Sequence, residues 1–181
     1  KGVDYRPINS CIHLLPSLDG KSIKTVESLK RTDGSLHPVQ QAMVDCHGSQ
    51  CGFCTPGIVM SLVNLVQIKP QPQRLDITDA LSGNLCRCTG YKPIIDATVQ
   101  ACQKGAGLKL DDQADVPLLQ EIRRSPVPTL SLEGDIISQP VLRTRKGNEF
   151  VAPSTVAEVA AYLTQHPQAT LLAGSSEIGL Q

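Results

Sequence analysis

The sequence has no tryptophan, and only 3% of its residues are aromatic. It therefore offers few rings on which the bases of a nucleic acid could stack. Its 17 basic and 17 acidic residues give a formal net charge of zero, so it also lacks the excess positive charge typical of surfaces that bind nucleic acids or anionic membranes. These deficits argue against both classes of partner.

Long apolar runs are also missing. The run from residue 62 to residue 68 is interrupted by Asn64 and Gln67, and no run reaches the roughly 18 residues that span a bilayer. The sequence does not open with a charged and then apolar leader, so we expect a cytoplasmic protein without a membrane segment. It begins in a strand-like pattern and stops after a glycine-rich loop, from which we expect a fragment of a larger polypeptide.

Cysteine, by contrast, is abundant and unevenly spaced. Four of the seven cysteines form a C-x-x-C pair, Cys51 and Cys54, and a C-x-C pair, Cys86 and Cys88. An odd count with this clustering is more typical of metal ligation than of a disulfide framework. Thiolates suit an iron–sulfur cluster best, since such clusters commonly take four cysteines. A structural zinc site is the main alternative, and free or disulfide-bonded cysteines are a weaker one.

Apolar periodicity predicts four helices in the middle of the chain, over about residues 38–46, 55–69, 76–81 and 92–104. Thr55, followed by Pro56, and Asp76 are the expected N-caps of the second and third. The second and fourth helices each follow a cysteine pair. We therefore expect a four-helix unit that holds all four thiols at two helix N-termini, where the helix dipole favours a more negative, reduced cluster.

The flanking segments have a different character. Residues 3–15 and 22–26 are predicted strands, too few to form a sheet alone, and are interpreted as the end of a β-rich domain. Residues 106–148 lack periodicity and are interpreted as a linker. A helix capped by Ser154, a strand over 169–173 and a loop over 174–179 then predict the start of an α/β domain.

Residues 50–57, QCGFCTPG, and 83–91, GNLCRCTGY, together resemble the helical 2Fe-2S domain of the molybdenum hydroxylases, a family that includes xanthine dehydrogenase, aldehyde oxidase and carbon monoxide dehydrogenase. The resemblance covers about residues 36–102. It implies that Cys51, Cys54, Cys86 and Cys88 ligate the cluster nearer the molybdenum cofactor, and that Gln50 and Cys88 lie beside its pterin.

The resemblance extends to both flanks. Cys11, in Asn9-Ser10-Cys11, matches the fourth ligand of the plant-type 2Fe-2S domain that precedes the helical one in this family. The region of residues 150–180 is similar to the opening of the flavin domain of xanthine dehydrogenases. It implies that one loop contacts FAD, namely Leu171, Leu172, Ala173, Gly174, Ser175, Ser176, Glu177 and Ile178.

The expected fold class is therefore α+β. Residues 1–32 would end a plant-type ferredoxin β-grasp domain, 33–105 would form the helical 2Fe-2S domain, and 149–181 would begin an α/β FAD-binding domain after the linker of residues 106–148. This organisation follows from the family resemblance together with the pattern of predicted elements.

The resemblance implies a function in a xanthine dehydrogenase-type enzyme. Electrons from purine hydroxylation, which converts hypoxanthine and xanthine to urate at a molybdenum-pterin centre, would pass through two 2Fe-2S clusters to FAD and then to NAD. The substrate site and the molybdenum would lie on another domain or subunit, so a hetero-oligomer is expected. The alternatives are the iron–sulfur part of an aldehyde oxidase or another molybdenum hydroxylase and, from a different class, a zinc-stabilised helical interaction module.

Overall fold

The computed structural model describes residues 3–105, 109–122, 129–131, 149–153 and 155–173. Contacts divide the chain into two compact units, one of residues 1–7 and 23–116 and the other of residues 8–22 and 117–181. The first unit contains the four cysteines of the two motifs. None of the described helices is long and apolar enough to cross a membrane.

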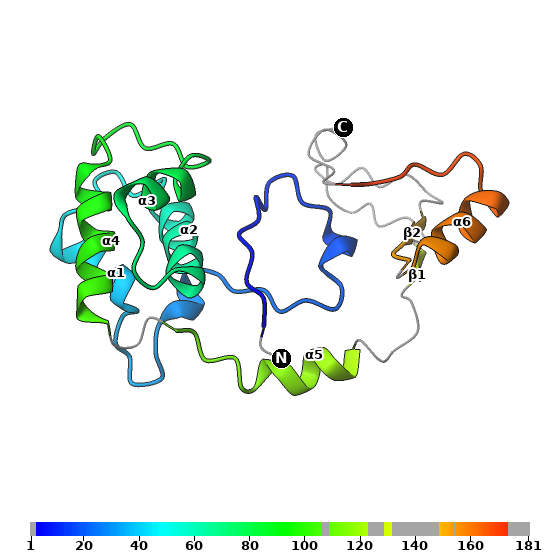
Figure 1. The fold of residues 1–181 in the computed structure, drawn as a ribbon, viewed down its shortest axis with the longest axis horizontal. Helices are drawn as coiled ribbons and strands as arrows, with labels where there is room; N and C mark the ends of the chain where they lie inside the picture. The colour runs from blue at the N-terminus through cyan, green and yellow to red at the C-terminus, as the bar shows by residue number, and fades with distance from the viewer. Residues whose placement is uncertain (1–2, 106–108, 123–128, 132–148, 154, 174–181) are drawn as a thin grey trace, which may run out of the picture. The chain divides into compact units, whose positions relative to one another are not determined.

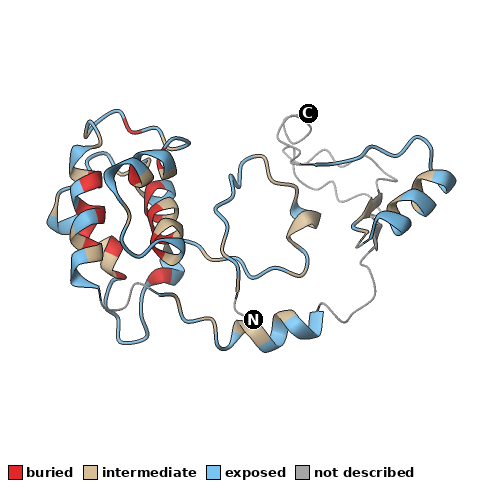
Figure 2. Cartoon of the chain, in the orientation of Figure 1, coloured by how far each residue is buried: buried red, intermediate tan, exposed pale blue. Residues whose placement is uncertain are grey.

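Four helices build the first unit, as predicted: α1 (Pro38–Asp45), α2 (Thr55–Ile68), α3 (Arg74–Ala80) and α4 (Lys92–Lys104). Helix α1 packs on α4, α2 contacts α1 and α3, and α3 contacts α4 (Figure 1). The buried residues line the inner faces of these helices (Figure 2). The largest fully buried side chains are Ile58, Leu62, Ile77, Ile94, Val39, Val63, Val66 and Thr98.

Two of the predicted helix caps are wrong. Helix α2 is capped by Cys54, and Thr55 is its first residue, with its hydroxyl 2.7 Å from the Ser49 hydroxyl. Helix α3 is capped by Gln73, whose N–H donates to the Asp76 carboxylate at 2.7 Å. Asp76 therefore acts from the third helical position, where a carboxylate can also satisfy a free N–H and complement the helix dipole.

The predicted strands are also wrong. In the described part of the first 105 residues the only elements besides α1 to α4 are two 3-10 helices, η1 (Leu15–Leu18) and η2 (Glu27–Leu29). Residues 169–173 likewise form no strand. A strand needs a neighbour for its backbone hydrogen bonds, and in the described residues these segments have none.

In its described residues the second unit contains one short pair of strands. Strand β1 (Thr129–Ser131) is antiparallel to β2 (Glu149–Val151), with Thr129 opposite Val151. Helix α6 (Val156–Gln165) follows, capped by Thr155, whose hydroxyl accepts from the Glu158 N–H at 3.2 Å. The predicted cap, Ser154, lies outside the described residues. Helix α5 (Asp115–Ile122) and β1 fall in the stretch interpreted as a linker.

Hydrogen bonds hold the segment that carries the second cysteine pair to α2 and to the start of α4. The Asn84 side chain donates to the Ser61 hydroxyl at 2.8 Å. Its Oδ1 atom lies so close to Gly57 that a Cβ there would be 3.2 Å away. The Tyr91 hydroxyl, at the start of α4, donates to the Asn84 carbonyl at 2.9 Å and accepts from the Cys86 N–H at 2.8 Å. Residues 84–91 thus form a loop closed by one phenol.

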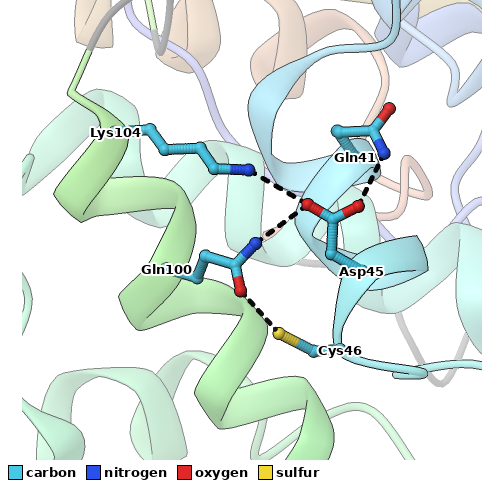
Figure 3. Close-up of polar contacts among 5 residues, drawn as sticks. All are labelled: Gln41, Asp45, Cys46, Gln100 and Lys104. Atoms are coloured by element: carbon cyan, nitrogen blue, oxygen red, sulfur yellow. Dashed lines mark hydrogen bonds and ion pairs between the residues drawn. The ribbon is translucent and has the colours of Figure 1, made fainter.

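A second set of polar contacts joins the end of α1 to the end of α4 (Figure 3). The Asp45 carboxylate accepts from Gln41 at 2.8 Å, from Gln100 at 2.9 Å and from Lys104 at 3.0 Å. The Cys46 thiol donates to the Gln100 amide oxygen at 3.1 Å. The hydrogen bond from Gln41 is the main reason why the pKa of Asp45 is lowered, and Lys104 lowers it further.

Replacing Asp45 with asparagine should therefore make the free energy of unfolding depend less on pH in the acidic range. A carboxyl with a lowered folded-state pKa stabilises the fold above its unfolded pKa of about 4, and this contribution disappears as pH falls through the folded value. Chemical denaturation should show Asp45→Asn to be less stable than the wild type at pH 7, with the difference shrinking below pH 4. Asp96→Asn, which breaks only the Lys92–Asp96 pair within α4, is the matched control. A difference that stays constant with pH would contradict the prediction.

Tyr91→Phe should loosen the loop of residues 84–91. It leaves the Cys86 N–H and the Asn84 carbonyl without their shared partner, which typically costs roughly 1–3 kcal/mol in the free energy of unfolding. Tyr5→Phe is the control, because the Tyr5 hydroxyl is buried and has no hydrogen-bond partner among the described residues. In denaturant unfolding, Tyr91→Phe should have a clearly lower free energy of unfolding than Tyr5→Phe. Equal free energies of unfolding would show that the Tyr91 phenol does not stabilise the loop.

Candidate metal centre

The C-x-x-C motif forms a tight turn directly before α2. Gly52 has φ +84°, in the left-handed region that glycine adopts without strain, and its carbonyl accepts from the Thr55 N–H at 3.2 Å. Cys54 is half-buried at the N-cap position of α2, and Cys51 is exposed. The turn therefore presents its two thiols beside the positive end of the α2 dipole.

The C-x-C motif leads into α4 through a second turn. Gly90 and Tyr91 both have positive φ, +66° and +68°, and the Lys92 N–H donates to the Gly90 carbonyl at 2.9 Å. Cys86 is buried and Cys88 is exposed. Arg87, between the two cysteines in the sequence, is exposed to solvent.

Thiols of one motif contact thiols of the other motif. The Cys88 and Cys51 sulfurs are 3.6 Å apart, with Cys88 donating. Cys54 and Cys86 also interact, since Cys86 raises the pKa of Cys54 and Cys54 lowers the pKa of Cys86. The folded chain thus sorts the four thiols into an exposed pair and a more buried pair, and each pair takes one cysteine from each motif.

The surroundings of these thiols give them different acidities. Hydrogen bonds from the Thr89 side chain and backbone lower the pKa of Cys86 to about 7. A hydrogen bond from the Phe53 backbone lowers the pKa of Cys51. Burial, and then its hydrogen bond to Cys86, raises the pKa of Cys54 to about 11, and donation to Cys51 raises the pKa of Cys88. Each pair therefore contains one thiol whose pKa is lowered, which favours the thiolate form that binds metals.

This donor set fits a two-iron cluster. Such a cluster takes four thiolates, two on each iron, and four thiols in two pairs match that requirement. Among the described residues, no three His, Cys, Asp or Glu side chains converge as the ligands of one ion. The amides at the start of α2 and α4 add positive potential at the thiols, which offsets the negative charge of a thiolate-bound centre.

Only some of the other residues expected at cofactors are among the residues that the structure describes. Gln50 is exposed next to Cys51. Cys11 is exposed in the second unit, where its N–H donates to the Asn9 side chain at 3.2 Å. Leu171, Leu172 and Ala173 are exposed, whereas Gly174, Ser175, Ser176, Glu177 and Ile178 lie outside the described residues.

Cys46, Cys102 and His37, also in the first unit, have structural positions. Cys46 and Cys102 are half-buried and pack against the helical core, as expected. His37 is buried and caps α1, with its Nδ1 atom accepting from the Val39 N–H at 3.2 Å. The sequence interpretation missed Thr89 and Tyr91. The only sequence signal for either was its place directly after the second thiol motif.

Comparison with known proteins supports the same centre. Residues 25–99 match the family described as the 2Fe-2S binding domain. Over 99% of its length the chain is 35% identical to human aldehyde oxidase and 33% identical to xanthine dehydrogenase from Drosophila pseudoobscura pseudoobscura. It spans 16% and 15%, respectively, of these two relatives.

A solved structure also matches. The crystal structure of quinoline 2-oxidoreductase from Pseudomonas putida 86 superposes with a TM-score of 0.53 and 39% sequence identity. The match covers 57% of this chain and 64% of that one. Sequence and fold agree that residues 25–99 form a 2Fe-2S binding domain, homologous to the iron–sulfur regions of aldehyde oxidase and xanthine dehydrogenase in the molybdenum hydroxylase family.

Proposed function

We propose that Cys51, Cys54, Cys86 and Cys88 hold one 2Fe-2S cluster, which carries single electrons within a molybdenum hydroxylase. The observation that supports this most directly is the pairing of the thiols across the two motifs, with Cys51 and Cys88 3.6 Å apart. In the proposed arrangement one iron takes the exposed pair and the other iron takes Cys54 and Cys86. The cluster supplies one-electron chemistry, and the chain supplies its ligands, its helix dipoles and its partial shielding from water.

In the complete enzyme we place this cluster between a molybdenum-pterin centre and a flavin. Gln50 and the exposed Cys88 would face the pterin, and Cys11 would be the fourth ligand of a second 2Fe-2S cluster. Residues 171–178 would form an FAD contact. The similarity of nearly the whole chain to aldehyde oxidases and xanthine dehydrogenases supports this order. The molybdenum site would belong to another domain or subunit.

For the substrate we propose a purine, with NAD as the final electron acceptor, as in a xanthine dehydrogenase. This proposal follows the similarity to the Drosophila xanthine dehydrogenase, which is 33% identical over 99% of this chain. The second candidate is an aldehyde, favoured by the 50% identity to rat aldehyde oxidase 1 over 103 residues. Steady-state assays of the whole enzyme with xanthine and NAD, and separately with an aromatic aldehyde and oxygen, decide between them.

The cluster assignment predicts a difference between the motif cysteines and the others. Cys86→Ser should greatly reduce bound iron and acid-labile sulfide and abolish the paramagnetic resonance signal of the reduced cluster. Cys46→Ser and Cys102→Ser should keep both, because these two thiols pack against the helical core and belong to neither motif. The helical circular dichroism of all three variants should be compared first, to confirm that each is folded.

Metal analysis of the same samples tests the whole proposal. Folded wild-type protein that was prepared anaerobically but carries stoichiometric zinc, without iron or sulfide, would favour the zinc-stabilised module. An unchanged resonance signal in Cys86→Ser would refute the assignment of that ligand.

A further inference from the structure

The hydroxyl of Thr89 makes two hydrogen bonds beside the more buried thiol pair. Its oxygen accepts from the Tyr91 N–H at 3.2 Å, and the same oxygen lies 3.1 Å from the Cys86 sulfur. Because Tyr91 is the donor in the first contact, the hydroxyl proton of Thr89 is free to point at Cys86. In the contact with Cys86 either the thiol or the hydroxyl can donate, and the Tyr91 N–H leaves the hydroxyl proton available for the sulfur.

The direction of this hydrogen bond is fixed once Cys86 binds a metal. A ligating thiolate has no proton, so only the Thr89 hydroxyl can donate. The Cys86 side is also the more protected one, since Cys86 is buried and Thr89 is half-buried, whereas Cys51 and Cys88 are exposed. A hydrogen bond to a charged sulfur is stronger where water competes less for it.

We propose that Thr89 is a positioning residue that raises the reduction potential of the cluster by donating its hydroxyl hydrogen bond to the Cys86 sulfur. This inference rests on the proposed 2Fe-2S function. Reduction adds one electron to the centre, breaks no bond and leaves the proton on Thr89. The added negative charge is shared by the sulfur ligands, so the hydrogen bond stabilises the reduced form more than the oxidised form.

The test is a redox titration of the iron-loaded protein, monitored by the paramagnetic resonance of the reduced cluster. Thr89→Val keeps the branched shape but removes the donor, so its midpoint potential should shift to a more negative value. Thr89→Ser keeps the hydroxyl and should restore a midpoint near that of the wild type. Thr78→Val is the matched control, because the Thr78 hydroxyl donates only to the Leu75 carbonyl within α3.

Iron and sulfide content separate the two proposals. If the wild type lacks both, the proposed function fails. If Thr89→Val retains both and has the wild-type midpoint, the role of Thr89 is overturned while the cluster stands. A Thr89→Ser midpoint shifted as far as that of Thr89→Val would also overturn it, because loss of packing would then explain both.

A second measurement needs no variant and applies even if Thr89→Val does not load iron. Electron–nuclear double resonance of the reduced wild-type cluster, in water and in deuterium oxide, should reveal a strongly coupled exchangeable proton. The absence of any such proton would contradict a hydroxyl hydrogen bond at the Cys86 sulfur.

Discussion

The candidate centre depends on the contacts that hold residues 84–91 against α2. The nearest cysteines of the two motifs, Cys54 and Cys86, are 32 positions apart in the sequence, and each motif sits on its own turn. Asn84 joins the second turn to Ser61 on α2, and the lack of a side chain at Gly57 lets it approach. This contact, together with the hydrogen bonds of the Tyr91 hydroxyl to Asn84 and Cys86, holds the second turn to α2 and to the start of α4.

Burial then makes the two halves of the centre unequal. The side with Cys54 and Cys86 lies toward the helical core, and the side with Cys51 and Cys88 faces solvent. Phe53 and Leu85, the sequence neighbours of Cys54 and Cys86, are 94% and 84% exposed. An electron carrier needs one insulated side to stabilise its charge states and one accessible side through which electrons can pass. The four thiols provide both within one small site.

The helices were predictable from sequence because their signal is local. Ile58, Leu62 and Val66, for example, recur on one face of α2 and are all buried. The strands were not, because an extended run such as residues 22–26 becomes a strand only beside a partner. The caps at Cys54 and Gln73 were misplaced by one to three residues, since several polar side chains near a helix start can satisfy the same amides. The pairing of the thiols across the two motifs depends on tertiary contacts, and no pattern in the sequence indicated it.

Tyr91 adopts φ +68°, a conformation that is uncommon for a residue with a bulky side chain and that costs of order 1–3 kcal/mol. Glycine is the substitution that would relieve this strain, yet glycine would also remove the phenol that closes the loop around Cys86. Stabilisation of the backbone and retention of the loop are therefore opposing demands at this position. Attempts to make the domain more heat-resistant should leave residue 91 unchanged and seek their gains on the outer surfaces of the helices.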